Sequence, residues 1–309
     1  MRRIAAFWLT ALLLLPLLVN AAPLRQGLLW KLSRPGQADA YLFGTVHVSS
    51  DRTLPLIEAA KSHLRPDMAL VLEIDPRQMH ADRGEIQVFG EQSLTRQLSQ
   101  DEGRRLLQRL QITGLTAQQI DRLQPWSAAL QLISLSLITQ KGISPLGADL
   151  RLAALAFSRQ QTLIGLETVD EQLDVFRQLP AEIQLGLLKD ALKPEALLTR
   201  NLQRLIDGYA REELPNLEQL MRQEQSVLHG QAQQLLINKL LTERDARMSQ
   251  RLQPLLARQA CFVAIGAGHL PGVLQHLEQA GYQLTAVPLL PGNRAAQPAS
   301  TMLKSASTP

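Results

Sequence analysis

The chain has 309 residues, a formal net charge of +4 and only 4% aromatic residues. This length is sufficient for a large hydrophobic core. The positive charges form no basic block, and the scarcity of aromatic side chains excludes a base-stacking surface of the kind that binds single-stranded nucleic acid. We therefore expect a peptide or a small molecule as ligand, and no nucleic acid.

The first residues are typical of a secretory signal peptide. Arg2 and Arg3 precede an apolar stretch at 4–19. Residues 19–21 (Val-Asn-Ala) fit the small-residue pattern at which signal peptides are cleaved. We predict a signal peptide over 1–21, a periplasmic location, and contact with the membrane only through this segment. An uncleaved membrane anchor is the alternative.

The next segments predict a hairpin, a helix and a buried strand. Residues 28–32 and 40–46 resemble strands joined by a turn-rich linker, which indicates a β-hairpin. A helix is expected over 54–63 and a strand over 68–74, with Glu73 near its end. A buried carboxylate is costly unless it is paired, hydrogen-bonded or bound to metal. Glu73 is thus a site candidate, unless it faces solvent.

From about 87 to 259 the periodicity is mostly helical, and we interpret this range as a helical insertion. It contains a helix opening at 147–149 (Gly-Ala-Asp), where capping is the first explanation for Asp149 and a role in the site is the alternative. It also contains a short apolar strand at 162–166 that is followed by Glu167. The next helix starts at Thr168, so Glu167 lies outside it and a capping role for Glu167 is less convincing.

The last segments predict two more strands with a helix between them. Strands are expected at 261–265 and 282–289, and the only cysteine, Cys261, should pack in the core and cannot form an internal disulfide. We predict a mixed α/β domain over 22–290, with a central mixed sheet. A disordered tail is expected over 291–309.

A Gly-x-x-His pattern follows two buried strands that are far apart in the sequence. One is 44–47 (Gly-Thr-Val-His) and the other is 266–269 (Gly-Ala-Gly-His). Open α/β sheets place their ligand sites beyond the carboxyl ends of their strands. Our hypothesis is that His47 and His269 converge on one site, which requires the two strands to be neighbours. Separate capping or packing roles are the alternative.

Two imidazoles with Glu73 or Glu167 form a mixed nitrogen and oxygen ligand set suited to Mn, Fe, Co or Zn. A metal with an open coordination position lowers the pKa of bound water and polarises a carbonyl. A carboxylate that is not a ligand could act as general base, and Arg244 could stabilise an oxyanion or hold a substrate carboxylate. A metal-free esterase using a histidine and a glutamate remains open, as does a metal- or haem-binding protein without turnover.

These motifs, with 147–149 and 165–168 (Gly-Leu-Glu-Thr) between them, resemble the TraB/GumN family, which is related to the TIKI metalloproteases and more distantly to the erythromycin-esterase/ChaN-like group. The resemblance implies a mixed α/β core with a large helical insertion and a divalent metal, Mn or Co, in a peptidase-like site. It matches His47 and His269 to the motif histidines and Glu73 to the carboxylate. The family commonly has Arg-Asn where this chain has Arg244 and Asp245.

Overall fold

The computed structural model describes residues 27–78, 87–213 and 226–290. The predicted signal peptide at 1–21 and the predicted tail at 291–309 lie outside these residues. The described part is mixed α/β, as predicted. Its sheet has the strand order β4-β3-β5-β2-β1-β6. The strands are β1 (Leu29–Ser33), β2 (Ala40–Thr45), β3 (Ala69–Leu72), β4 (Leu163–Gly165), β5 (Cys261–Gly266) and β6 (Gln283–Val287).

The sheet combines an antiparallel side with a parallel side. β1 and β2 form the predicted hairpin, with Leu29 opposite Phe43, and β6 pairs antiparallel with β1. β2, β5, β3 and β4 are parallel to one another. Parallel strands end at the same edge of a sheet, so the segments after β2, β3, β4 and β5 meet there.

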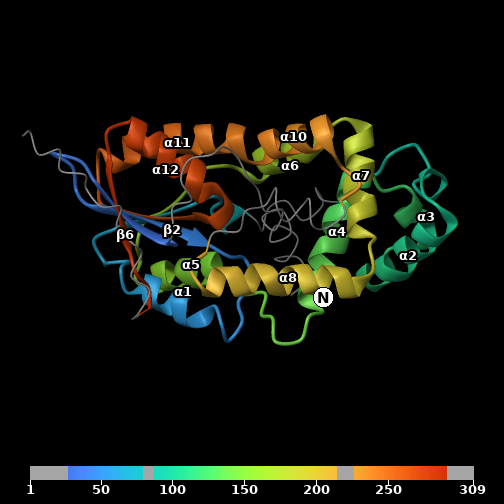
Figure 1. Cartoon of the computed structure of the whole chain (residues 1–309), viewed down its shortest axis with the longest axis horizontal. Coiled ribbons are helices and arrows are strands. Elements are labelled where there is room, and N and C mark those ends of the chain that lie inside the picture. The colour runs from blue at the N-terminus through green and yellow to red at the C-terminus, as the bar shows by residue number, and fades with distance from the viewer. Residues whose placement is uncertain (1–26, 79–86, 214–225, 291–309) are drawn as a thin grey trace, which may run out of the picture.

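Helices cover both faces of this sheet (Figure 1). α11 and α12 lie on one face, and α1 and α5 lie on the other. The helices are α1 (Leu54–Lys61), α2 (Gln100–Leu110), α3 (Ala117–Asp121), α4 (Pro125–Ile138), α5 (Ala148–Ser158), α6 (Val169–Arg177), α7 (Ala181–Ala191), α8 (Glu195–Ala210), α10 (Gly230–Ile237), α11 (Glu243–Leu256) and α12 (Leu270–Gln279).

The apolar side chains of β5 alternate between the two helical layers. Phe262 packs in the same cluster as Ile57 of α1, whereas Val263 packs with Met248 of α11. Every residue of β5 is buried. This follows from the central position of β5, because a parallel strand covered on both faces has no solvent-facing side.

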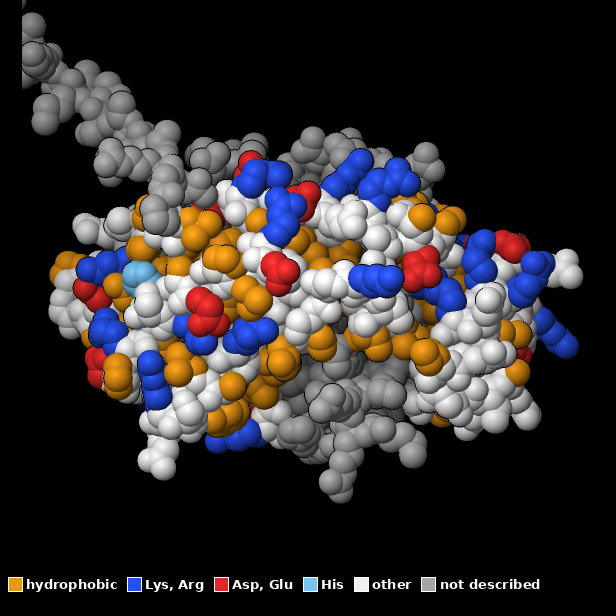
Figure 2. All heavy atoms as spheres, turned by 90° about the horizontal axis from the view of Figure 1, so that it is seen from below, with side chains coloured by type: hydrophobic (Ala, Val, Ile, Leu, Met, Phe, Trp, Pro, Cys, Tyr) orange, Lys and Arg blue, Asp and Glu red, His pale blue; other side chains and the backbone are white. Residues whose placement is uncertain are grey.

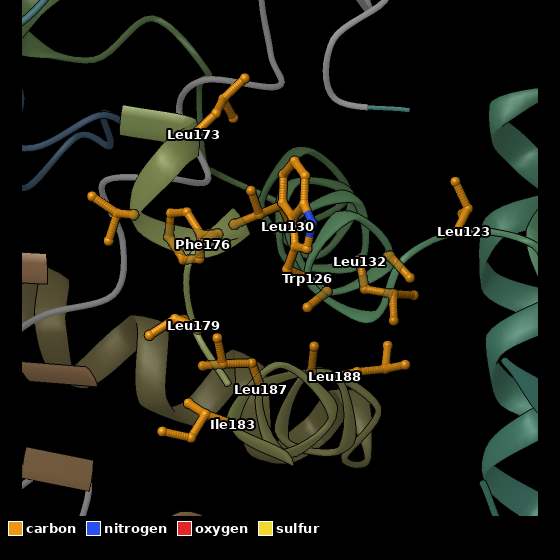
Figure 3. Close-up of a cluster of buried hydrophobic side chains, with 14 of the residues drawn as sticks. Leu123, Trp126, Leu130, Leu132, Leu173, Phe176, Leu179, Ile183, Leu187 and Leu188 are labelled. Carbon is orange, nitrogen blue, oxygen red and sulfur yellow. The ribbon is translucent and has the colours of Figure 1, made fainter. Parts of the chain in front are cut away.

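A second apolar core lies among the helices beyond the sheet (Figure 3). Trp126 and Leu130 of α4 lie close to Phe176 of α6 and above Leu187 of α7. The structure is largely helical over the range predicted for the insertion, but that range also contributes β4 to the sheet, where the sequence predicted a strand.

A π-helical segment, Asn238–Thr242, connects α10 to α11. π-Helical segments are rare in proteins, and many of those that occur lie near functional sites. Here the π-helix ends two residues before Arg244, and Arg244 and Asp245 are both buried although they are adjacent in the sequence.

On the face shown in Figure 2, basic, acidic and apolar side chains are interspersed, without a large area of one charge.

Within the described ranges, no helix has the length and apolar character needed to cross a bilayer.

Candidate functional site: two histidine–aspartate pairs and a buried Glu–Arg–Glu cluster

Both motif histidines lie at the edge where β2 and β5 end. The two strands pair in parallel with Thr45 opposite Gly266, as the shared-site hypothesis requires. Gly266 lies between the rings: a Cβ atom placed on it would lie 3.6 Å from His47 Nε2 and 3.7 Å from His269 Cδ2. The same atom would lie 3.1 Å from Glu73 Oε1. The structure thus brings His47, His269 and Glu73 together around one glycine.

An aspartate contacts the ring of the first histidine. His47 Nδ1 lies 2.7 Å from Asp149 Oδ2. The prediction that Asp149 caps its helix is wrong, because Gly147 occupies the N-cap position without a side-chain cap and Asp149 lies in the first turn of α5. A Cβ atom on Gly147 would come within 2.3 Å of the His47 backbone, so glycine allows the start of α5 to approach the histidine.

A second aspartate contacts the ring of the other histidine. His269 Nδ1 lies 2.5 Å from Asp245 Oδ1. The opposite oxygen of Asp245 lies against Gly272 of α12, where an added Cβ atom would be only 2.0 Å from Oδ2. Asp245 thus lies between α12 and the ring of the second motif histidine.

These contacts leave the Nε2 atoms of both rings directed away from the aspartates. A carboxylate at one ring nitrogen fixes the tautomer and orientation of a histidine and is the usual support of a metal ligand. His47 Nε2 is buried and has no hydrogen-bond partner among the described residues. His269 Nε2 lies 4.0 Å from Glu73 Oε1.

Glu73 and Glu167 share one buried arginine. Arg244 Nη2 lies 2.6 Å from Glu73 Oε2 and 2.6 Å from Glu167 Oε2, and Arg244 Nε donates to Glu167 Oε2 at 3.0 Å. Gln172 Nε2 donates to both carboxylates at 3.1 Å. The alternative that Glu73 faces solvent is therefore wrong, since only 4% of its surface is exposed.

One oxygen of Glu73 remains outside the arginine contact. Glu73 Oε1 accepts a hydrogen bond from the Gly266 backbone N–H at 2.6 Å and is the oxygen nearest to His269 Nε2. The carboxylate thus links the Arg244 cluster to the two imidazoles.

Burial and the local charges shift the pKa values of the two glutamates in opposite directions. Burial raises the pKa of Glu73 above its ordinary value despite the nearby Arg244 guanidinium. Burial also acts on Glu167, but the charge and hydrogen bonds of Arg244 hold the pKa of Glu167 below its ordinary value. Carboxyl pairs whose environments separate their pKa values commonly divide the acid and base roles of a site.

The two histidines also differ. Burial opposes the charged form of His47, but the charge and hydrogen bond of Asp149 raise its pKa above the ordinary value. Burial, together with the Arg244 charge, lowers the pKa of His269 in spite of Asp245. His269 is therefore neutral over a wider pH range than His47.

The donor chemistry fits a divalent metal, although the carboxylate is partly committed. Two oriented imidazoles, one with a buried and unpartnered Nε2, and a nearby carboxylate oxygen are a typical ligand set. Across residues 27–78, 87–213 and 226–290, no three His, Cys, Asp or Glu side chains are arranged as they stand to hold a metal ion. The fit therefore rests on the two imidazoles, with Glu73 as the nearest third donor.

Sequence reasoning missed Gln172 and left Asp149 and Asp245 undecided. Gln172 lies one turn into α6, four residues after Thr168, where the capping signal of Thr168 and Glu171 draws attention to the helix start instead. No local signal marks Asp245. Consecutive residues of a regular helix point about 100° apart, so a helix that directs Arg244 to the site is not expected to direct Asp245 there as well.

The fold and the site define a mixed α/β protein with a histidine and carboxylate centre at the carboxyl edge of its parallel strands. A family model for the TraB/PrgY/gumN family matches residues 28–286. The chain belongs to this family. Searches of the curated proteins and of the solved structures each found no significant match.

Proposed function

We propose that the protein is an exported, metal-dependent hydrolase that cleaves peptide or amide bonds. The observation that carries the proposal is the pair of aspartate-oriented imidazoles around Gly266, with a buried, unpartnered His47 Nε2. Leaving such a nitrogen unpaired is unfavourable, and a metal ligand role accounts for it.

His47 and His269 would hold the metal, with Glu73 as the closest oxygen donor. A bound divalent metal supplies Lewis acidity and lowers the pKa of a water molecule at the site. Mn or Co is the expected ion from the family resemblance, and Zn or Fe also suits these donors.

The chain's own residues would orient the rings and accept a proton. Asp149 and Asp245 hold the two imidazoles, while Arg244 and Gln172 fix the positions of both glutamates. Because burial raises the pKa of Glu73 above its ordinary value, Glu73 is the more basic of the two carboxylates and would accept a proton from water if it is not a metal ligand. Glu167, whose pKa is lowered, would remain ionised and hold Arg244 in place.

A metal-binding protein without turnover is a second candidate. It is favoured by the Arg244 contacts, because both glutamates are already paired with a buried cation and neither is an isolated base. This candidate needs the same histidines but predicts no hydrolysis.

Metal analysis combined with a peptide hydrolysis panel tests the proposal. We expect one metal per chain in the purified protein, loss of hydrolysis after chelation, and recovery with Mn²⁺ or Co²⁺. H47A and H269A should lose both metal and activity. His276→Ala is the matched control, because His276 lies on α12 outside the site.

Each alternative has its own outcome. Stoichiometric metal without hydrolysis of any peptide or ester would support the binding protein. Hydrolysis that persists after thorough chelation would show a metal-free mechanism using a histidine with Glu73 or Glu167.

A further inference from the structure

The last turns of α8 lie along the segment that connects β2 to α1 and carries His47. α8 begins among the helices beyond the sheet, where Gln140 Nε2 donates to Thr199 Oγ1 at 2.7 Å. Its other end lies beside the sheet, and Tyr209 packs there in one apolar cluster with side chains of α1 and α5 (Figure 1). α8 therefore links the helical core to the part of the sheet that bears the site.

Three side chains on one side of α8, spaced by four and three residues, face this segment: Leu202, Ile206 and Tyr209. The first two pack in one apolar cluster with Val48. The hydroxyl of the third donates a hydrogen bond to the Gly44 carbonyl at 2.9 Å. The helix thus contacts the chain on both sides of His47, three residues before it and one residue after it.

The hydroxyl of Tyr209 remains a hydrogen-bond donor throughout the neutral pH range. Only 3% of Tyr209 is exposed. Burial, together with the nearby charges of Asp149 and Glu212, raises the pKa of the phenol well above its ordinary value. A buried hydroxyl without a partner is unfavourable, so the folded chain is expected to keep the bond to Gly44.

Gly44 lies between Tyr209 and the turn that carries His269. A Cβ atom on Gly44 would lie 2.4 Å from Leu270 Cδ1 and 3.1 Å from Ala267 Cα, so this turn occupies the space of a side chain. A glycine has no side chain to restrict its dihedral angles. Contact with the turn locates the glycine, and the Tyr209 hydroxyl orients its carbonyl, so Gly44 relates the positions of the two segments that carry the histidines.

The other restraints on the segment after β2 come largely from the backbone. The Ala148 N–H donates to the Val46 carbonyl at 2.8 Å, and Ser49 and Ser144 exchange backbone hydrogen bonds of 2.7 and 2.8 Å. Tyr209 adds a side-chain bond at the glycine that opens the first Gly-x-x-His motif. Unlike the backbone bonds, it can be removed by a substitution that changes a single atom.

We propose that Tyr209 is a positioning residue, which holds the Gly44 carbonyl and thereby fixes the backbone that leads to His47 and the place of the His47 imidazole. The proposal rests on the proposed metal site, since it assigns the support of one of the two histidine ligands. Tyr209 acts through the backbone of residues 44–47 and not on the ring itself.

The histidine rings of the metal-free full protein test this inference without any turnover. Long-range ¹H–¹⁵N NMR spectra report the tautomer and surroundings of each imidazole, and H47A, H269A and H276A assign the signals. Y209F removes the hydroxyl and keeps the aromatic ring. We expect the His47 signals to shift or broaden in Y209F, whereas those of His269 and His276 stay as in the wild type.

Metal titration measures the consequence for the proposed centre. Y209F should bind Mn²⁺ or Co²⁺ about tenfold more weakly, the smaller of the losses usual for groups that support a ligand. 4-Aminophenylalanine in place of Tyr209 provides an N–H donor at the same point and should return the His47 signals and the metal affinity toward the wild type. If Y209F does not fold, this replacement supplies the test, because its weaker donor should still displace the His47 signals.

Y282F is the matched control. Tyr282 is 5% exposed and its hydroxyl donates to Gln37 Oε1 at 2.8 Å, so Y282F removes a comparable hydroxyl from the turn before β6. We expect Y282F to lower the midpoint of urea denaturation about as much as Y209F does, with unchanged His47 signals and metal affinity. The comparison separates positioning of the ring from a general loss of stability.

The outcomes distinguish this inference from the hydrolase proposal. Displaced His47 signals in Y209F, in a protein that binds no metal and hydrolyses nothing, would support the role of Tyr209 and reject the hydrolase. His47 signals that are unchanged in Y209F, or are displaced equally by Y282F, would overturn the role of Tyr209 whether or not hydrolysis occurs. In a protein that binds metal, an affinity unchanged by Y209F would overturn it as well.

Discussion

Asp245 Oδ1 lies 2.5 Å from His269 Nδ1, and the equivalent contact between Asp149 and His47 is 2.7 Å. The two aspartates come from different helices, α11 and α5, which cover opposite faces of the sheet. Each histidine follows its own strand. The two halves of the site therefore share one arrangement, in which a strand end presents the ring and a helix on one face of the sheet supplies the carboxylate.

Replacing Asp245 with asparagine tests whether orientation or charge matters at this position. The amide oxygen can still accept a hydrogen bond from His269 Nδ1, so we expect D245N to fold. Its metal affinity should fall by about tenfold, the smaller of the losses usual for such supporting residues. D245A should lose more, because no acceptor remains. Metal titration of both variants checks this, and equal affinities for D245N and D245A would contradict it.

Gly272→Ala should disturb the site although alanine is the better helix former. In an exposed helix interior this change is worth about 1 kcal/mol in favour of alanine. Here the added Cβ atom would lie 2.0 Å from Asp245 Oδ2 and 3.0 Å from Asp245 Cβ, so Asp245 must move away from His269. We expect weaker metal binding and a lower free energy of unfolding, measured by titration and urea denaturation. G281A, at the end of the same helix, meets no nearby atoms but has a positive φ, so it should affect stability without affecting metal binding.

Arg244→Met should be among the most destabilising substitutions. It would leave Glu73 and Glu167 buried without their cation, at a cost of about 3–5 kcal/mol. The deficit should shrink as the pH falls, because protonation neutralises the two buried carboxylates that the variant leaves without a cation. Urea denaturation at neutral and acidic pH measures both effects. Arg247→Met, which loses one long contact, should change the free energy of unfolding far less.

The Glu171 and Arg251 ion pair gives a defined dependence of stability on pH. The hydrogen bonds with Arg251 lower the pKa of Glu171 from its ordinary 4.5 to about 2. A depressed carboxyl pKa stabilises the folded protein above the unfolded value, so this contribution is present above pH 4.5 and is lost as the pH falls toward 2. Both side chains are about a third or more exposed, and a contribution of about 0.2–1 kcal/mol is expected.

Comparison of E171Q with the wild type isolates that charge. Glutamine can preserve the capping box with Thr168, as Gln119 does with Thr116 elsewhere in the chain. The difference in the free energy of unfolding should therefore be present at pH 7 and vanish near pH 2. A difference that stays constant over this range would show that the ion pair contributes nothing.

The single thiol should be unreactive in the folded protein. Cys261 is fully buried at the start of β5, and burial raises its pKa to about 11. The thiolate is the nucleophile, so Ellman's reagent should label the native chain only as fast as the chain opens. In urea one thiol per chain should react promptly. Rapid labelling without denaturant would contradict this packing.

Local patterns were sufficient to predict the strands of the sheet and both histidines of the site. The turn before β2 and the helix start at Thr168 are properties of a few adjacent residues. The repeated Gly-x-x-His pattern placed His47 and His269 beyond strand ends for the same reason.

The partners of these residues could not be predicted in this way. Asp149 lies 102 residues from His47, and an aspartate in a first helical turn already has a sufficient local explanation. The placement of β5 between β2 and β3 is likewise a property of the packed sheet. Arg244 and Arg247 look alike in the sequence, and only burial separates them: 2% against 36% exposed.

The central position of β5 has a consequence for how the protein is made. During synthesis the N-terminal hairpin and β3 emerge first, but they do not pair with each other, because β5 lies between them. The middle of the sheet therefore cannot form until residues 261–266 have been synthesised, and strand pairings between residues this distant in the chain form slowly. A chain that stops short of β5 would lack both the second ring and the strand that joins the two halves of the sheet.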